Sequence, residues 1–226
     1  AEMQKQTGEV MAEVLESVRY GVMKAGSTVI YANGSSRSAV NTAISLNTLR
    51  KAARTLESNR ARRVTSRLAP GLQYGTRAVK ASYIVFIHTD MEADVRNLAG
   101  YVDVSEYGSF KPIHDREVGS CEGFRFISSP FLKSFEASGS GTLNGMLSVG
   151  SSNVDVYPTI IIGEQCWGQV ALKGMGAIKP VVISANETNH ANPLGQFGYC
   201  GASTYYAAVR LNESFMCRVE SGVSSL

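Results

Sequence analysis

Three histidines, His88, His114 and His190, are the side chains in this sequence best suited to acid–base chemistry near neutral pH. His88 lies two residues before Asp90 and six before Asp94, a spacing that would suit a metal site or an acid–base pair. A histidine that ends a strand beside a helix cap is, however, more often held there by a structural hydrogen bond. We therefore expect no catalytic and no metal-binding residue, although an enzyme built on His88 and Asp90 stays open as an alternative.

The usual phosphate-binding and nucleophile motifs are missing from the sequence. It contains no Gly-x-Ser-x-Gly elbow, no Gly-x-x-x-x-Gly-Lys-Ser/Thr loop and no Gly-x-Gly-x-x-Gly after a strand. The four cysteines include no Cys-x-x-Cys pair, which argues against a zinc site and favours reduced thiols. We expect no cofactor.

The stretch Ala81–Leu98 would position His88 and Asp90. Tyr83–Ile87 is apolar on both alternating faces and rich in aromatic and β-branched residues, a pattern typical of a buried strand. Asp90 is then expected to cap a helix in which Met91, Val95 and Leu98 form one apolar stripe. A buried strand that leads into a capped helix predicts a mixed sheet-and-helix domain of the α+β class.

Other elements follow from periodicity and turn residues. Glu2–Lys24 predicts a long amphipathic helix with Val10, Met11, Val14, Leu15, Val18 and Val22 as its apolar stripe. A second helix, capped by Ser45 or Asn47, is expected to run to about Asn59, and Arg60–Gly75 is expected to be a loop. Strands are predicted at Thr28–Ala32, Gly123–Ile127, Tyr157–Gly163, Val181–Ile183 and within Thr204–Val219, with a turn or short helix at Gly163–Gly168.

The positive charge is concentrated in one segment. Between Arg37 and Lys80 the sequence has ten basic residues and one acid, Glu57, although the whole chain has a net charge of only +3. This segment could contact phosphates, could be a solvated surface, or could meet the acidic region 90–122 of a neighbouring copy. No aromatic residue lies among the basic residues of 60–69, where bases would need to stack, so a nucleic-acid-binding domain is the weaker alternative.

Length and composition set outer limits. The 226 residues fit one domain or two lobes, and 44% hydrophobic residues are enough to build a core. No stretch approaches the roughly 20 apolar residues needed to cross a bilayer, and no secretory leader is present, so we expect no membrane association. The chain begins with Ala-Glu inside a predicted helix, which suggests a processed chain or a fragment.

The order of segments resembles the major capsid proteins of tailed bacteriophages with the Hong Kong 97-type fold. Among these, the coat proteins of podoviruses of the N-four type are the most similar subgroup. The resemblance covers nearly the whole chain and rests on six segments in order: Glu2–Asn33, Ser45–Leu56, Tyr83–Arg96, Arg116–Pro130, Tyr157–Val170 and Tyr205–Glu213.

The resemblance implies a long spine helix at 2–24 and a mixed central sheet flanked by helices. It assigns 1–39 and 173–226 to a peripheral lobe and 40–172 to an axial lobe. The N-terminal arm and extended loop that family members carry before the spine helix have no counterpart in this sequence.

The implied function is structural and not enzymatic. Copies would assemble into hexamers and pentamers of an icosahedral shell that encloses double-stranded DNA, bound without sequence specificity. Scaffolding, portal or decoration proteins are further implied partners, and the implied location is the virion, after assembly in the cytoplasm of a bacterial host. An encapsulin-like nanocompartment shell is the alternative within the same fold.

We predict that subunits contact one another through charged residues of the segments 37–80 and 90–122. The expected contact residues are Arg50, Arg54, Arg60, Arg62, Arg63, Asp103, Glu106 and Glu117.

Overall fold

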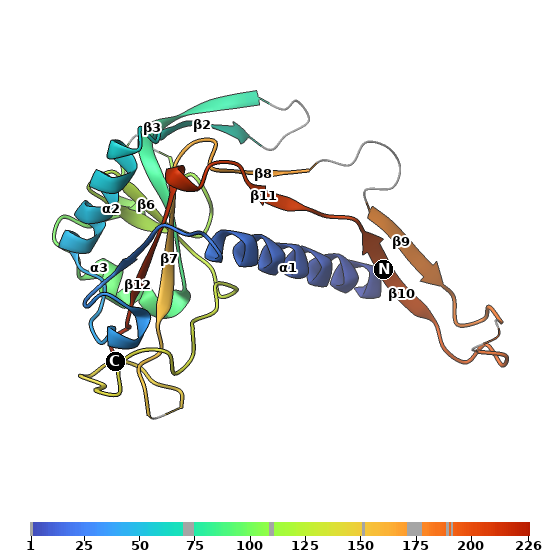
Figure 1. Ribbon diagram of the computed structural model, residues 1–226. Coiled ribbons are helices and arrows are strands. Elements are labelled where there is room, and N and C mark those ends of the chain that lie inside the picture. The colour runs from blue at the N-terminus through green and yellow to red at the C-terminus, as the bar shows by residue number, and fades with distance from the viewer. Residues whose placement is uncertain are drawn as a thin grey trace. The chain divides into compact units, whose positions relative to one another are not determined.

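The computed structural model describes residues 2–69, 75–108, 111–150, 152–170, 178–188, 190 and 192–226. The chain divides into two compact units (Figure 1). Unit 1 comprises Ala1–Val22 and Trp167–Val209, and unit 2 comprises Met23–Cys166 and Arg210–Leu226. Each unit is therefore built from two segments that lie far apart in the sequence.

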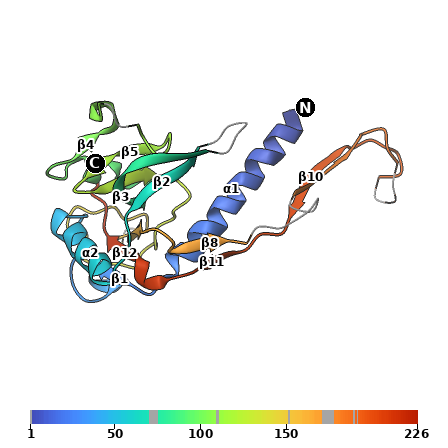
Figure 2. The ribbon, with the colours of Figure 1, turned by 90° about the horizontal axis from the view of Figure 1, so that it is seen from above.

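Unit 2 is built on a mixed sheet, as the α+β prediction requires (Figure 2). Parallel pairs (β1 with β12, β3 with β6) occur beside antiparallel ones. The strand order is β1 (Val29–Tyr31), β12 (Met216–Ser221), β7 (Tyr157–Ile162), β3 (Gly75–Ile87), β6 (Phe124–Ser128), β5 (Glu117–Cys121) and β4 (Val102–Asp103), with β2 (Val64–Ala69) paired to β3 outside this path.

The side chains of the two central strands are apolar on both faces; β7 is buried on both, whereas Ile84 and Phe86 on the second face of β3 are half-buried. Tyr83, Val85 and Ile87 of β3 belong to the core, and every residue of β7 is buried. β3 leads into a 3₁₀ turn, η2 (Thr89–Met91), and then α3 (Glu92–Arg96), so the predicted strand-to-helix unit is confirmed. The expected stripe of Met91, Val95 and Leu98 is buried.

The cap of this turn differs from the prediction. His88, and not Asp90, occupies the cap position, because its ring Nδ1 accepts a hydrogen bond from the backbone N–H of Asp90 at 3.2 Å. The carboxylate of Asp90 instead accepts a hydrogen bond from the Tyr157 hydroxyl at 2.8 Å. The carboxylate is therefore used to tie the turn to β7.

Helix α2 (Leu46–Ser58) packs against β1 and β12. Ser45 is its N-cap and accepts a hydrogen bond from the backbone N–H of Thr48 at 3.3 Å. Leu49, Ala52 and Leu56 are buried, whereas the basic residues Arg50, Lys51 and Arg54 are exposed. The sequence thus predicted this helix, and of the two residues considered as its cap, Ser45 occupies the position.

The prediction of a loop over Arg60–Gly75 was wrong for Val64–Ala69 and for Gly75, which are strand residues. β2 and the first half of β3 form an antiparallel ribbon in which Arg67 faces Arg77, with a register shift between Val64 and Ser66 (Figure 1). Pairing satisfies the backbone N–H and C=O groups of both strands even though several of their residues are polar or basic. The expected turn at Pro70–Gly71 lies outside the described residues.

Unit 1 contains the long helix and two ribbons. α1 (Glu2–Lys24) has the predicted bounds, and all but its last two residues belong to this unit. β9 (Ile178–Ile183) pairs antiparallel with β10 (Tyr199–Thr204), and β8 (Trp167–Gln169) pairs with β11 (Ala208–Arg210). Trp167–Gly168 is thus a strand and not a turn, and the stretch Thr204–Val219 is divided among several elements, including η4 (Glu213–Phe215).

Candidate functional site

The junction of β3 and η2 is the place where the sequence offered acid–base chemistry. His88 Nδ1 lies 3.2 Å from Asp90 Oδ2, and the His88 ring lies 5.3 Å from the Tyr157 ring. Burial, followed by the hydrogen bond to Asp90, raises the pKa of the Tyr157 hydroxyl far above its usual range. The hydroxyl therefore stays protonated and acts as a hydrogen-bond donor to Asp90. The contacts of all three residues serve to cap η2 and to hold it against β7.

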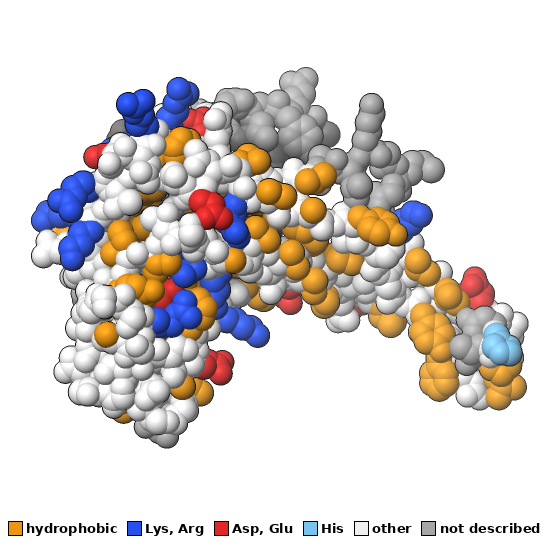
Figure 3. All heavy atoms as spheres, viewed as in Figure 1, with side chains coloured by type: hydrophobic (Ala, Val, Ile, Leu, Met, Phe, Trp, Pro, Cys, Tyr) orange, Lys and Arg blue, Asp and Glu red, His pale blue; other side chains and the backbone are white. Residues whose placement is uncertain are grey.

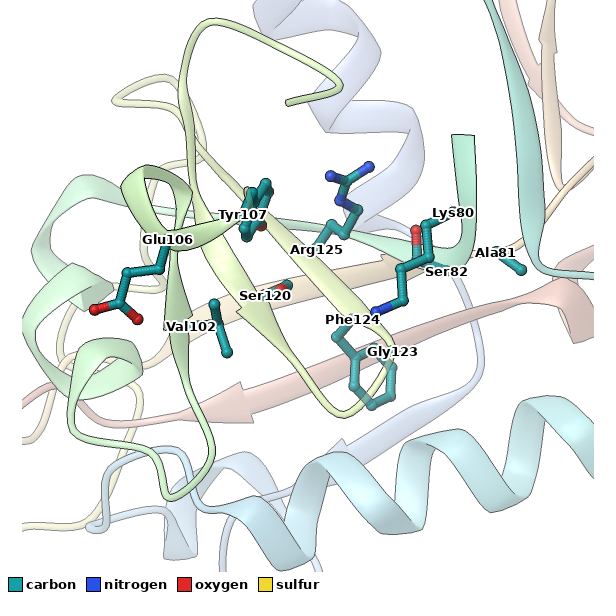
Figure 4. A pocket seen from close by; sticks show the side chains of 10 residues that line it. All are labelled: Lys80, Ala81, Ser82, Val102, Glu106, Tyr107, Ser120, Gly123, Phe124 and Arg125. Atoms are coloured by element: carbon teal, nitrogen blue, oxygen red, sulfur yellow. The ribbon is translucent and has the colours of Figure 1, made fainter. Parts of the chain in front are cut away.

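A pocket in unit 2 has a volume of about 220 Å³, smaller than typical ligand sites (Figure 4). β3 and β6 contribute one wall, and the segment 102–107 contributes the other. The side chain of Glu106, one of the predicted contact residues, lines it, as does Ser82, whose buried hydroxyl has no hydrogen-bond partner among the described residues. The lining residues are Lys80, Ala81, Ser82, Val102, Glu106, Tyr107, Ser120, Gly123, Phe124 and Arg125.

Arg125, which lines this pocket, forms a buried ion pair with Glu117. Arg125 Nε lies 2.8 Å from Glu117 Oε1, and both side chains are almost fully buried. The hydroxyl of Tyr107 donates to the same Glu117 oxygen at 2.8 Å, and the ring of Tyr107 lies 5.1 Å from the Arg125 guanidinium. Because these three side chains satisfy one another, they form a fixed structural network beside the pocket.

Several of the charged residues predicted for contact between subunits are paired within the chain. Arg50 Nε donates to Glu122 at 2.9 Å, Arg63 to Glu57 at 2.7 Å, and Arg96 lies 3.4 Å from Asp103. The Arg50 hydrogen bond lowers the pKa of the Glu122 carboxyl. Glu117 is buried with Arg125, whereas Arg54, Arg60, Arg62 and Glu106 are exposed.

Helix α1 exposes apolar side chains that the sequence pattern assigned to a single covered stripe. Val10, Val14 and Val18 lie four residues apart on one face and are 57%, 53% and 45% exposed, respectively. Met11, Leu15 and Val22, from the same predicted stripe, are partly buried. The predicted stripe therefore has two sides: Met11, Leu15 and Val22 are partly covered, and Val10, Val14 and Val18 form an open apolar edge.

The rest of unit 1 is also poorly covered. Tyr20 and Asn192 are the only buried residues among those that the structure describes in this unit. Figure 3 shows hydrophobic side chains at the surface over α1 and over β9 and β10. A groove of about 450 Å³ lies within the unit; it is lined by Gln4, Thr7, Gly8 and Met11 of α1 and by Pro180, Val182, Cys200, Gly201 and Ala202 of the β9–β10 ribbon.

The described residues include no group of three His, Cys, Asp or Glu side chains that could hold a metal ion. In the same part of the chain, no helix is both long and apolar enough to cross a membrane.

Solved structures of phage capsids have a backbone fold similar to that of this chain. The capsid of cyanophage P-SCSP1u matches with a TM-score of 0.54 at 14% identity, over 99% of this chain and 66% of that one. The head of Helicobacter pylori bacteriophage KHP40 matches with a TM-score of 0.55 at 10% identity, over 94% of this chain and 66% of that one. The chain has the fold of phage capsid proteins.

An encapsulin has a similar fold. The SrpI encapsulin of Synechococcus elongatus matches with a TM-score of 0.54 at 13% identity, over 98% of this chain and 65% of the encapsulin chain. The chain thus spans slightly less than two thirds of the length of each of these capsid-fold proteins. No protein-family model and no curated protein sequence matches it.

Proposed function

We propose that this chain is the structural major capsid protein of a tailed bacteriophage, whose copies assemble into an icosahedral shell around double-stranded DNA. The observation that carries the proposal is the exposed apolar surface of unit 1, on α1 and on the β9–β10 ribbon. Contiguous apolar surface is rare on proteins that act as monomers, and burying it is a main source of association free energy. The likeness to phage capsids supports a second copy as the covering partner.

The finer assignments rest on the sequence segments quoted above. They are the Hong Kong 97-type fold, the N-four type podovirus subgroup, and the division into a peripheral lobe (1–39 and 173–226) and an axial lobe (40–172). The proposed protein carries out no catalysis, assembles in the host cytoplasm and resides in the virion. Scaffolding, portal or decoration proteins are its proposed further partners, and packaged DNA contacts it without sequence specificity.

The proposal is tested by the oligomeric state of the purified chain and of a variant in which Val10, Val14 and Val18 are all replaced by Ser. Valine and serine have similar helix propensities, so α1 is retained while its open apolar edge is removed. We expect the wild type to form closed particles in electron microscopy and the variant to sediment as small species. Gln6→Ser with Ala12→Ser, at exposed positions of the same helix, is the matched control and should assemble.

A wild-type chain that stays monomeric at all concentrations would contradict the proposal, and so would full assembly of the triple variant. The encapsulin-like nanocompartment is the second candidate, favoured by the SrpI match. Nucleic-acid and protein analysis of particles isolated from the native host distinguishes the two. Packaged double-stranded DNA supports the phage capsid, and a cargo enzyme supports the nanocompartment.

A further inference from the structure

Three cationic side chains of unit 2 gather around one aromatic ring. Lys24 Nζ lies 3.9 Å from the centroid of the Phe135 ring, Arg37 Cζ lies 3.5 Å from it and Arg218 Cζ lies 5.9 Å from it. These residues come from the end of α1, the 3₁₀ turn η1 (Arg37–Ala39), the segment before Glu136 and β12. Attraction between each cation and the face of the ring helps to hold the positive charges in place before any partner arrives.

A single carboxylate lies among these cations. Glu220 is fully buried and accepts hydrogen bonds from Arg37 Nε at 2.7 Å, Arg37 Nη2 at 2.8 Å and Arg218 Nε at 2.8 Å. Both oxygens of Glu220 are therefore occupied by arginine. The cluster therefore contains one carboxylate, Glu220, and three cationic side chains.

The other acceptors in the cluster are neutral carbonyls. Lys24 Nζ donates to the carbonyl of Lys133 at 2.6 Å, and Arg218 donates to the carbonyls of Lys24 and Gly26 where α1 ends. The end of a helix supplies about half a negative charge at most. The cluster therefore keeps an excess of more than one positive charge.

This excess is unfavourable in the isolated subunit. Burial, and then the nearby Arg37 and Arg218 guanidinium groups, lower the pKa of the Lys24 ammonium. Arg37 keeps 31% of its side chain exposed, so the cluster opens to the surface. An anion that approached from outside would relieve the repulsion among the three cations.

We propose that Lys24, Arg37 and Arg218, arranged around Phe135, form a receptor for a carboxylate of a second copy of this chain. The inference rests on the proposed function and names a contact by which the shell would close. Charge complementarity favours a second copy, because Glu2 and Glu13 of the exposed helix α1 have no cationic partner among the described residues. The cluster thus supplies a charged contact in addition to the apolar edge of α1.

The test replaces Lys24 by Met, which keeps an unbranched stem over Phe135 and removes the charge. We expect the dissociated variant to unfold cooperatively with a midpoint close to that of the wild type, because relief of repulsion opposes the loss of the Lys24 hydrogen bond to the Lys133 carbonyl. We expect the concentration needed for half-maximal assembly to rise about tenfold, with a weaker dependence on NaCl. Lys133→Met, which removes an exposed charge nearby, is the matched control and should assemble like the wild type.

Equal assembly of wild type and Lys24→Met would overturn the inference while leaving the proposed function intact.

If the wild type does not assemble at all, the proposed function fails. A second measurement then shows whether the cluster around Phe135 binds an oxyanion. Inorganic phosphate, compared with chloride at equal ionic strength, should raise the unfolding midpoint of the wild type but not that of Lys24→Met. Equal effects of phosphate on both proteins would show that the cluster binds no oxyanion.

Discussion

At the residue scale, the Cys217 thiol shows how burial in the sheet controls chemistry. Cys217 lies in β12, faces Ile161 of β7 and has no exposed surface. Burial raises the pKa of this thiol to about 12 from its ordinary value of 9.0. The folded protein therefore keeps the thiol protonated and unreactive at neutral pH.

The shifted thiol makes stability depend on pH in the alkaline range. Below pH 9 the thiol is protonated in both states, so its stabilising contribution is complete. Between pH 9 and 12 the unfolded chain releases the proton and the folded protein retains it, so stability falls as pH rises.

Cys217→Ala should therefore lose stability less steeply than the wild type between pH 9 and 11, by up to about 1.4 kcal/mol per pH unit. Urea unfolding at several pH values measures the two slopes. Cys200→Ala, at a partly exposed position, is the control and should keep the wild-type slope. A Cys217→Ala slope equal to that of the wild type would contradict the assigned cause.

Glu117 shows the limit of reading a charged residue from sequence. The sequence placed it on an acidic surface for a neighbouring copy, whereas the fold buries it against Arg125 and under the hydroxyl of Tyr107. Arg50 likewise pairs with Glu122, 72 residues later in the chain. Such pairings depend on the register of β5 and β6 and on the position of α2, which local sequence does not contain.

At the scale of elements, the helices and strands whose apolar residues recur at a regular spacing were predicted well. The bounds of α1, the course of α2 and the buried strands β3 and β7 follow from apolar spacing. The ribbon of β2 and β3 was missed because pairing, and not an apolar face, holds its basic residues in strands. The open edge of α1 was missed because periodicity shows which residues are apolar but not which of them a neighbour covers.

The cap of α2 gives a test at this scale. Ser45→Ala removes the side-chain acceptor for the Thr48 backbone N–H and should lower the free energy of unfolding by about 1 kcal/mol. Asn47→Ala, at the other position that the sequence offered as a cap, should leave the unfolding midpoint nearly unchanged. Urea unfolding of both variants measures the difference, and a larger effect at Asn47 would show that the cap is misassigned.

At the scale of the whole molecule, the prediction that the basic segment 37–80 contacts a neighbouring copy can be tested directly. We predict that Arg50→Glu with Arg54→Glu weakens assembly and reduces its sensitivity to salt, because Arg54 is exposed and a reversed charge would repel acids of a neighbour. Light scattering at several NaCl concentrations measures the effect. Unchanged assembly would refute the contact.

The intrachain pair supplies a control for this double variant. Arg50→Glu with Glu122→Arg restores opposite charges at the same two positions of one chain. If this exchange assembles like the wild type while the Arg50 and Arg54 variant does not, the loss is assigned to Arg54 and its neighbour. If the exchange also fails, Arg50 itself takes part between subunits.

The place of β12 in the sheet has a consequence for biosynthesis. β12 lies between β1 and β7, so two strands separated by more than a hundred residues cannot be joined until Met216–Ser221 has been translated. A nascent chain on the ribosome therefore has an unfilled gap in its sheet until β12 has emerged, so the sheet of unit 2 cannot be completed before that point. If the chain assembles as proposed, copies that still lack β12 would consequently be unable to join a growing particle.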